Sequence, residues 1–598
     1  MIREIINFTS DLMFDFPDVM QWNATPNDGL HIFADVDDEG NWQKDTTEVY
    51  TIKKGVGNID KKTFFKILKY EQMGERVGTS MNKVFDLPAK KIFSCSPFIV
   101  SFKKKSLSDI KDSLGRYFST AQTSCIKGDE RLIQKSEVLR RILPNVLVGL
   151  NEPISSLKDD EFVAIYLASV SIDDYKKAHD KYLKDKLFNT DKFNTDVDGE
   201  SWGMSGFCNG LNSKKPFLEH KTSVNKISGI ISASDAMTLN KFERLVASKT
   251  LPNPLPIIID NREINGELIK IFNEENTPLS YKEMIKRVFE KKNLSSLSNF
   301  YLLNYFKKKE IEFRDIDFVT SFKYQFDSPI VIRNILGIKD FSAEKIHNIF
   351  DFERLVISPV FNNSLVKIKE DKYTVSYFGD IDSNYVSGGE IMYSLIMKYR
   401  KAVYDYIYKA QHKAISSIMF EDMMSQSILS NIRKDEVKTI RFSWNNQIKH
   451  KLNIWFSLYN LFNKNKENME SKLEELIIKS KEVAKGEAHI NSCEEFAFAA
   501  GQIVSFLIDR SVATNKTYSL LEPYLQKVKS GQLQDAIAQS IAVYKHDVST
   551  YKGAFHALAS NVLTYDNAID MKPLLKFFLA GCFADCVIYS KKNSNINE

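Results

Sequence analysis

The alternation of apolar and polar residues predicts strands and helices in the N-terminal part of the chain. Leu30 to Val36 alternates as a strand does, turn residues follow at 37–41, and Glu48 to Gly55 has the pattern of a returning strand. A β-hairpin is therefore expected. Further strand patterns begin at Phe162, Ile316 and Tyr373. Helical periodicity separates them, most clearly over residues 172–188 and 281–292.

After about Gly388 the strand patterns stop, and the remaining 200 or so residues are rich in Leu, Ile, Met, Ala, Lys and Glu. Ser492 and Glu495 have the spacing of a capping box and precede an apolar stripe on one helical face. The stripe consists of Phe496, Ala499, Ala500, Ile503, Phe506 and Leu507. Similar stripes begin at Leu533 and Phe555, and short turns join them, which favours an antiparallel helical bundle.

These patterns predict an α+β protein in which a mixed α/β N-terminal region precedes an all-α C-terminal helical bundle. The polar stretch 460–472 interrupts the helical pattern and marks the strongest boundary. We expect an N-terminal region over 1–387, a helical connector over 388–468 and the bundle over 469–598.

Size and composition add a broad class. The chain has 598 residues, of which 43% are hydrophobic and 27% charged, enough to bury several cores. No apolar run is long and clean enough to span a bilayer, and the first residues lack a secretory pattern. Six scattered cysteines do not suit a disulfide scaffold. A cytoplasmic protein without a membrane anchor is therefore expected.

Charge is unevenly distributed along the chain. Residues 1–50 carry 2 basic and 11 acidic side chains, whereas residues 51–125 carry 15 basic and 6 acidic ones. Within the basic segment, lysines flank an apolar run that contains Phe93, Phe98 and Phe102, so the run suits either a nucleic-acid surface or an edge strand protected by lysines. The candidate phosphate contacts are Lys90, Lys91, Lys103, Lys104, Lys105 and Arg116.

Two further stretches are candidates for nucleic-acid contact. Residues 431–451 have a net charge of +4 and place Lys438, Arg441, Lys449 and Lys451 on an expected helix, which would either track a strand or form a solvated face. The loop at 205–223 offers flexible backbone and hydrogen-bond donors at Asn209, Asn212, Lys214 and Lys215. Its single cysteine and single histidine, Cys208 and His220, cannot complete a tetrahedral zinc site, so no metal or cofactor is expected.

The usual enzyme signatures are absent: there is no phosphate-binding glycine loop, dinucleotide fingerprint, nucleophile elbow or paired-histidine zinc motif. The best catalytic alternative is a metal-dependent nuclease in which Asp35 and Asp37 share one face of a strand end. The same residues are ordinary hairpin-turn chemistry. His179 beside Asp180 is interpreted as part of a solvated, lysine-rich helix face.

Several segments, taken in order, resemble the large subunit of type I-B CRISPR interference complexes, the RNA-guided assemblies called Cascade. They are the block around Cys95, the stretch from Phe162, the segment from Leu255, and the C-terminal run with Gly501, Gln502 and Ser511. That run continues through residues 520–525 to the helix with Tyr544, Lys545 and His546. The likeness spans nearly the whole chain, and it depends on the order of these motifs.

The resemblance implies a non-enzymatic subunit without a cofactor. Its N-terminal region would read the protospacer-adjacent motif in duplex DNA, help to form the R-loop and lie near the guide-RNA handle. Its C-terminal bundle would contact the displaced strand and recruit the helicase-nuclease. The implied partners are guide RNA, target double-stranded DNA and the backbone, handle-binding and small subunits. Met469 would be an internal translation start that yields a separate small subunit.

Overall fold

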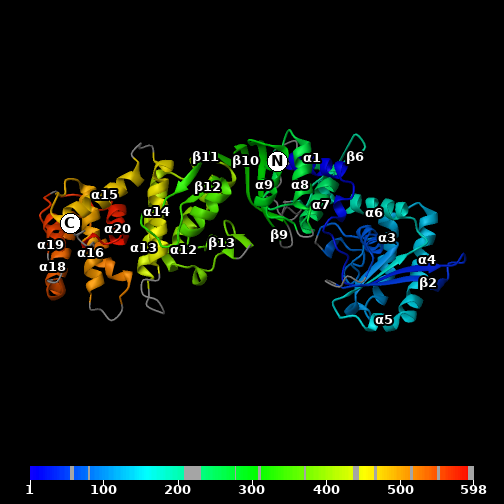
Figure 1. Cartoon of the computed structure of the whole chain (residues 1–598). Helices are drawn as coiled ribbons and strands as arrows, with labels where there is room; N and C mark the ends of the chain where they lie inside the picture. Colours follow the sequence, from blue (N-terminus) through cyan, green and yellow to red (C-terminus); the bar gives the residue numbers. More distant parts are fainter. Residues whose placement is uncertain are drawn as a thin grey trace. The chain divides into compact units, whose positions relative to one another are not determined.

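The computed structural model describes residues 1–53, 59–78, 81–207, 222, 230–275, 278–307, 311–369, 372–435, 444–463, 468–511, 516–548, 553–566 and 568–589. Two compact units account for the chain, and the order of elements can be followed in Figure 1. Unit 1 comprises Met1–Asn293 and Ser298–Thr320, and unit 2 comprises Leu294–Leu297 and Ser321–Glu598. This division by packing does not follow the three regions expected from the sequence, whose boundaries stay predictions about function.

A four-stranded sheet forms the first core of unit 1. Its strands are β1 (Gly29–Val36), β2 (Trp42–Ile52), β3 (Ile99–Lys103) and β4 (Phe162–Leu167), in the order β2-β1-β4-β3. The β1–β2 hairpin is confirmed, and β2 begins as early as Trp42, since residues 44–47 of β2 bulge opposite Ala34 and pairing resumes between Asp35 and Gln43. β1 pairs in parallel with β4. Every residue of β1 from Gly29 to Ala34 is buried, as expected for a central strand covered on both faces.

Helices pack against this sheet: α2 (Lys61–Gln72), α3 (Lys111–Cys125), α4 (Glu130–Gly149), α5 (Asn151–Ser155) and α6 (Ile172–Lys186). The helix predicted over 172–188 is thus confirmed. The lysine-flanked run at 90–105 is not one continuous strand, because it folds back on itself through bridges between Ile92 and Phe102 and between Ser96 and Ile99. Only Ile99–Lys103 enters the sheet, as its edge strand.

A second core of unit 1 combines a three-stranded sheet with four helices. The strands are β8 (Leu255–Ile258), β9 (Leu297–Lys307) and β10 (Ile311–Phe322), in the order β10-β9-β8. The helices are α1 (Ile2–Asp15), α7 (Ala233–Ala247), α8 (Arg262–Phe272) and α9 (Tyr281–Lys292), the last with the predicted bounds. A small sheet of β5 (Thr195–Val197), β6 (Glu200–Gly203) and β7 (Ile231–Ser232) precedes α7.

Unit 2 begins with two antiparallel strand pairs and continues as helices. The strands are β11 (Gln325–Ile332), β12 (Glu344–Asn348), β13 (Val366–Lys369) and β14 (Lys372–Val375), with short helices α10 (Ile349–Phe352) and α11 (Ser358–Val360) between the pairs. Next come α12 (Gly389–Tyr408), α13 (Ser417–Arg433) and α14 (Asn445–Phe462). After β14, the described part of unit 2 contains helices and no assigned strand. This confirms the predicted α+β class.

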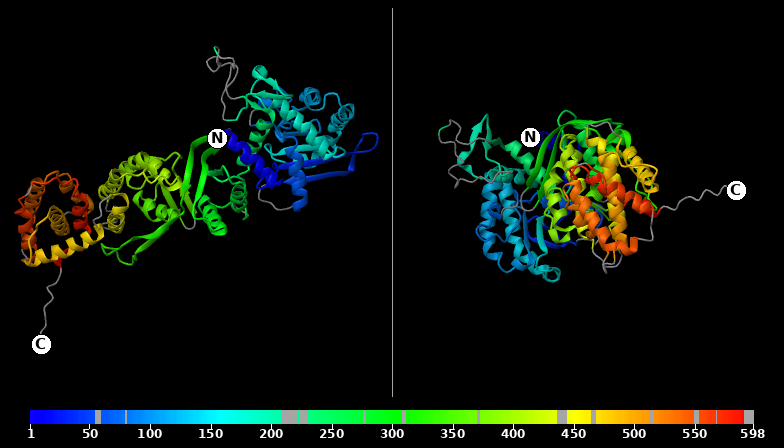
Figure 2. Two further views of the ribbon diagram at one scale, coloured as in Figure 1. Left: turned by 90° about the horizontal axis from the view of Figure 1, so that it is seen from above. Right: turned by 90° about the vertical axis from the view of Figure 1, so that its left-hand side faces the viewer.

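The C-terminal helices form a bundle, drawn in orange and red in Figure 2. They are α15 (Met469–Lys485), α16 (Cys493–Arg510), α17 (Glu522–Leu525), α18 (Ser530–Val548), α19 (Ala554–Leu563) and α20 (Leu575–Phe583). Half of the predicted capping box is present, since the Ser492 hydroxyl accepts from the Glu495 amide at 3.2 Å. The Glu495 carboxylate instead accepts from the amide of Asn491, at 2.8 Å.

Glycines allow α16 and α20 to cross with their backbones in contact. A Cβ added at Gly501 would lie 2.2 Å from the Phe578 carbonyl oxygen, and one at Gly581 would lie 2.1 Å from that of Phe498. The buried Gln502 amide donates to the Gly581 carbonyl at 2.7 Å and accepts from the Val587 amide at 2.8 Å. This contact gives a structural role to the Gly501-Gln502 pair.

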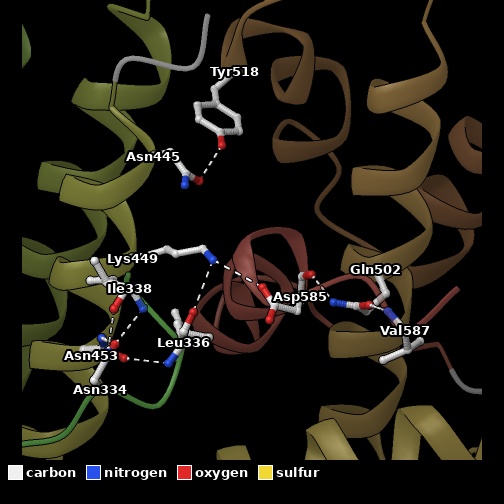
Figure 3. Close-up of polar contacts among 11 residues, drawn as sticks. Asn334, Leu336, Ile338, Asn445, Lys449, Asn453, Gln502, Tyr518, Asp585 and Val587 are labelled. Atoms are coloured by element: carbon white, nitrogen blue, oxygen red, sulfur yellow. Dashed lines mark hydrogen bonds and ion pairs between the residues drawn. The ribbon is translucent and has the colours of Figure 1, made fainter. Parts of the chain in front are cut away.

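Polar contacts also hold the bundle to α13 and α14, and those of Lys449 and Tyr518 with α14 and its surroundings are drawn in Figure 3. Lys449 of α14 donates to the Leu336 carbonyl at 3.2 Å and lies 3.5 Å from the Asp585 carboxylate. The Tyr518 hydroxyl donates to Asn445 at 2.6 Å, and Lys576 of α20 pairs with Glu421 of α13 at 3.1 Å. Residues on both sides of position 469 thus pack within one unit. Among the described helices, none is long and apolar enough to cross a membrane.

Candidate functional site

A cleft of about 360 Å³ lies in unit 1, between the end of α2, the β3–β4 edge and α7. Acidic, basic, aromatic and amide side chains all line it. They include Glu71, Glu75, Glu243, Arg76, Arg244, Lys307, Phe93, Phe162, Tyr166, Asn27 and Asn240. A two-signed lining of this kind offers donors and acceptors together, as the edge of a nucleobase requires.

Two aromatic side chains with a basic side chain at each end connect this cleft to the lysine-rich end of β3. The Lys103 amine lies 5.8 Å from the centroid of the Phe162 ring, and that ring meets Phe93 edge to face at 5.3 Å. The Arg76 guanidinium lies 5.8 Å from the Phe93 centroid. We call these four residues the basic–aromatic row. Basic side chains next to aromatic rings are typical of surfaces that hold phosphates and stack bases.

Arg244 of α7 is held in the cleft by Glu75, with 2.7 Å between guanidinium and carboxylate. His179 of α6 helps to position Glu75, since its Nε2 donates to the Glu75 carbonyl at 2.7 Å. Burial lowers the pKa of His179 to about 4, so the ring is neutral at pH 7. The interpretation of His179 as part of a solvated face is therefore wrong: only 4% of the residue is exposed.

A hydrogen-bond chain leads from the cleft, where Asn27, Glu71 and Tyr166 are lining residues, to the buried His31. The Asn27 amide donates to Glu71 at 3.1 Å, and the Asn27 carbonyl accepts from Nε2 of His31 at 2.9 Å. Because Nε2 must then carry the proton, Nδ1 accepts from the Tyr166 hydroxyl at 3.0 Å. Burial lowers the pKa of His31 to about 4, which keeps this ring neutral.

Glu71 gives unit 1 a pH dependence. Burial raises the pKa of its carboxyl from 4.5 to about 7. Between these pH values the folded state holds a proton that the unfolded chain has released, so the free energy of unfolding falls as pH rises. The stability that the protonated Glu71 carboxyl contributes is lost above pH 7. We expect Glu71→Gln to match the native protein at pH 5 and to exceed its free energy of unfolding by about 1–2 kcal/mol at pH 8.

Urea denaturation at the two pH values, followed through hydrogen exchange of β1 peptides, measures this difference. The exposed Glu152→Gln in the same unit is the control, because it removes a carboxylate that faces solvent. Equal pH slopes in the two variants would contradict the role given to Glu71.

The six described lysines and arginines predicted for phosphate contact all have partners within the chain. Three of them donate to uncharged oxygens. Lys90 donates to the Asn82 side chain at 2.6 Å, Lys104 to the Ser155 carbonyl at 3.0 Å and Arg116 to the Leu87 carbonyl at 2.7 Å. Lys91 lies 3.3 Å from Asp109. Lys103 and Lys105 share Asp160, at 3.2 and 2.8 Å. Asp160 thus offsets part of the positive charge at this edge.

The other predicted contacts lie outside the described residues. They are Asn209, Asn212, Lys214 and Lys215 of the 205–223 loop, with its Cys208 and His220, and Lys438 and Arg441 before α14.

The described end of the expected cationic helix is not a charged outer face. Lys451 is buried, and Lys449 is held by the Leu336 carbonyl and Asp585. Both earlier interpretations, a strand-tracking face and a solvated face, are wrong for these two lysines because α14 packs them inward.

Asp35 and Asp37, the nuclease alternative, lie at the end of the β1–β2 hairpin. Asp37 accepts from the amides of Asn41 and Glu39, at 2.7 and 3.1 Å, and from Gln43 at 3.0 Å. These hydrogen bonds, that from Asn41 foremost, lower the pKa of Asp37. The carboxylate therefore stabilises the turn. Among the described residues, no three His, Cys, Asp or Glu side chains are grouped as metal ligands.

Sequence reasoning identified Phe93, Lys103 and the start of β4 but missed Glu71, Arg244 and Asn240. These residues come from distant segments, and no spacing connects them. Arg76 was included only within the basic segment 51–125. Comparison with family models, curated proteins and solved structures finds no match to this chain.

Proposed function

We propose that this chain is the non-catalytic large subunit of an RNA-guided CRISPR surveillance complex. In this role it recognises the protospacer-adjacent motif in double-stranded DNA, helps to form the R-loop and recruits the helicase-nuclease. The observation that carries the proposal is the basic–aromatic row. It joins the block around Cys95 to the stretch from Phe162, two of the segments that resemble the family, and it leads from a lysine-rich edge into a cleft with base-reading chemistry.

The two ends of the row have different tasks in this proposal. Lys103 and Lys105 contact phosphates and set the register of the duplex, which contributes affinity without sequence preference. Arg76, Arg244 and Asn240 line the cleft and contact base edges, where guanidinium and amide groups discriminate between base pairs.

Copurification tests membership in the complex. Coexpressed with backbone subunits and guide RNA, the chain is expected to elute with them in one ribonucleoprotein at moderate salt. A chain that elutes alone, free of nucleic acid, would remove the basis of the proposal.

The ion pairs at Asp160 allow a two-way test of the lysine edge. Asp160→Asn releases Lys103 and Lys105 from their shared carboxylate, so we expect the complex to bind target DNA more tightly, by about threefold at low salt. Lys103→Gln should weaken binding and lower the log–log salt slope by about one. Fluorescence anisotropy with labelled duplex between 50 and 200 mM salt measures both.

Arg131→Gln is the matched control. Arg131 is an exposed basic residue of unit 1 that pairs with Asp174 and does not line the cleft. If Asp160→Asn weakens binding, or if all three variants share one slope, the lysine edge does not face DNA.

Met469 is the proposed start of a separate small subunit of residues 469–598. It is the first residue of α15 and is buried, with 4% of the residue exposed. Met469→Leu preserves an apolar side chain there and should leave the full chain folded. We expect an immunoblot against the C-terminus to lose a second product of 130 residues while the full chain persists. A short product that persists unchanged in the variant would contradict initiation at Met469.

A further inference from the structure

A second cavity lies in unit 2, at the start of α14. Its volume is about 500 Å³, within the range of sites for small organic ligands. Trp444 and Phe341 supply aromatic walls, and the exposed amides of Asn446 and Gln447 stand at its rim. The lining therefore combines ring surfaces with hydrogen-bonding groups.

A buried amine adjoins this cavity without an acidic partner. Lys451 is 1% exposed, and its Nζ contacts only neutral oxygens, Oδ1 of Asn362 at 2.7 Å and the Ser427 carbonyl at 3.4 Å. In the part of the chain that the structure describes, no carboxylate forms an ion pair with it. Burial lowers the pKa of Lys451 well below its ordinary value, because the charged form lacks a counterion. An anion in the cavity would supply that counterion.

His450, beside Lys451, presents a buried atom without a hydrogen-bond partner in the described part of the chain. Its Nδ1 is buried and has no hydrogen-bond partner among the described residues, and its ring packs edge to face on Phe341 at 5.0 Å. Burial lowers the pKa of His450 to about 4, so the ring is neutral at pH 7. A buried polar atom without a partner is costly, and a ligand group that hydrogen-bonds to it would remove that cost.

The cavity also adjoins the N-terminus of α14. Trp444, the residue that precedes this helix of 18 residues, provides no side-chain cap. The amides of the first turn carry the positive end of the helix dipole and favour a negatively charged group.

We propose that this cavity binds a nucleotide, with its phosphate toward Lys451 and the start of α14 and its base against Trp444. Asn446 and Gln447 then face the polar edge of the base. The nucleotide is either free or part of a single strand, because both present the same base and phosphate. This inference does not depend on the proposed function, since the cavity lies wholly in unit 2.

Calorimetry on the full chain tests the site with four probes: AMP, adenosine, inorganic phosphate and a ten-residue oligodeoxyadenylate. We expect AMP or the oligonucleotide to bind at least tenfold more tightly than adenosine. The double variant Asn446→Asp/Gln447→Glu should weaken that binding at least tenfold. It should not unfold α14, because acidic side chains favour a helix N-terminus.

Lys413→Gln/Lys481→Gln is the matched control, because it changes the net charge equally at two exposed positions of the same unit. If the rim variant loses AMP binding but keeps oligonucleotide binding, while the control variant keeps both, the ligand is a free nucleotide. If the rim variant loses only oligonucleotide binding, the ligand is a single strand. Absence of binding by both probes, or an equal effect of the rim and control variants, would overturn the proposal. A chain that binds AMP but does not join a ribonucleoprotein would retain this site and lose the proposed function.

Discussion

Gly581→Val is expected to separate α16 from α20 and destabilise unit 2 by about 3 kcal/mol or more. The physical reason is the backbone contact at the crossing: any Cβ at position 581 would overlap the Phe498 carbonyl, which is main chain and cannot rotate away. The displacement would also break the hydrogen bond from Gln502 to the Gly581 carbonyl, leaving a buried amide without its acceptor. Hydrogen exchange of α16 and α20 peptides in urea measures the loss.

Gly531→Ala provides the control in the same bundle. Gly531 lies in the first turn of α18, and no atom lies within 4 Å of the position that its Cβ would occupy. Alanine there should leave stability unchanged or raise it slightly, since it favours helix over glycine. Equal exchange rates in the two variants would show that the helices do not meet at Gly581.

Arg76→Gln/Arg244→Gln is expected to reduce the preference for the correct protospacer-adjacent motif. Each guanidinium lines the cleft, and a bidentate arginine contact to a base contributes about 1–3 kcal/mol of discrimination. The complex should therefore lose roughly tenfold or more in affinity for duplexes with the preferred motif. Duplexes with other motifs should bind nearly as before. Competition binding across a library of flanking sequences measures the change.

The matched control is Arg131→Gln/Lys177→Gln, which removes two exposed positive charges of unit 1 outside the cleft. It should lower affinity for all duplexes alike, if at all. A uniform loss in both double variants, with the motif preference intact, would mean that the cleft does not read bases.

Local patterns predicted the elements of this fold well where one segment contains all the information. The β1–β2 hairpin, α6, α9 and the start of α16 all follow from periodicity and turn or cap residues in their own segments. The extension of β2 to Trp42 was missed because residues 43–47 of β2 are all polar and the pairing register shifts there, so no alternation marks this part of the strand.

The sites were less predictable because distant residues form them. Phe93 and Lys103 attracted notice in a basic, aromatic segment, whereas Arg244 enters the cleft from α7 and is positioned by Glu75 and His179. Lys451 was expected on an outer face because lysine is usually exposed, yet neutral oxygens of Asn362 and Ser427 accommodate it inside unit 2. Tertiary packing decides such cases, and a charge count along the chain cannot.

The most direct measurement of the central claim compares target binding by purified complexes assembled with and without this chain. With the chain present, we expect tight binding of duplex DNA that carries the correct flanking motif, and opening of that duplex as seen by permanganate footprinting. Without it, both binding and opening should be lost. A complex that lacks the chain and still binds and opens its target equally well, with any flanking motif, would contradict the account.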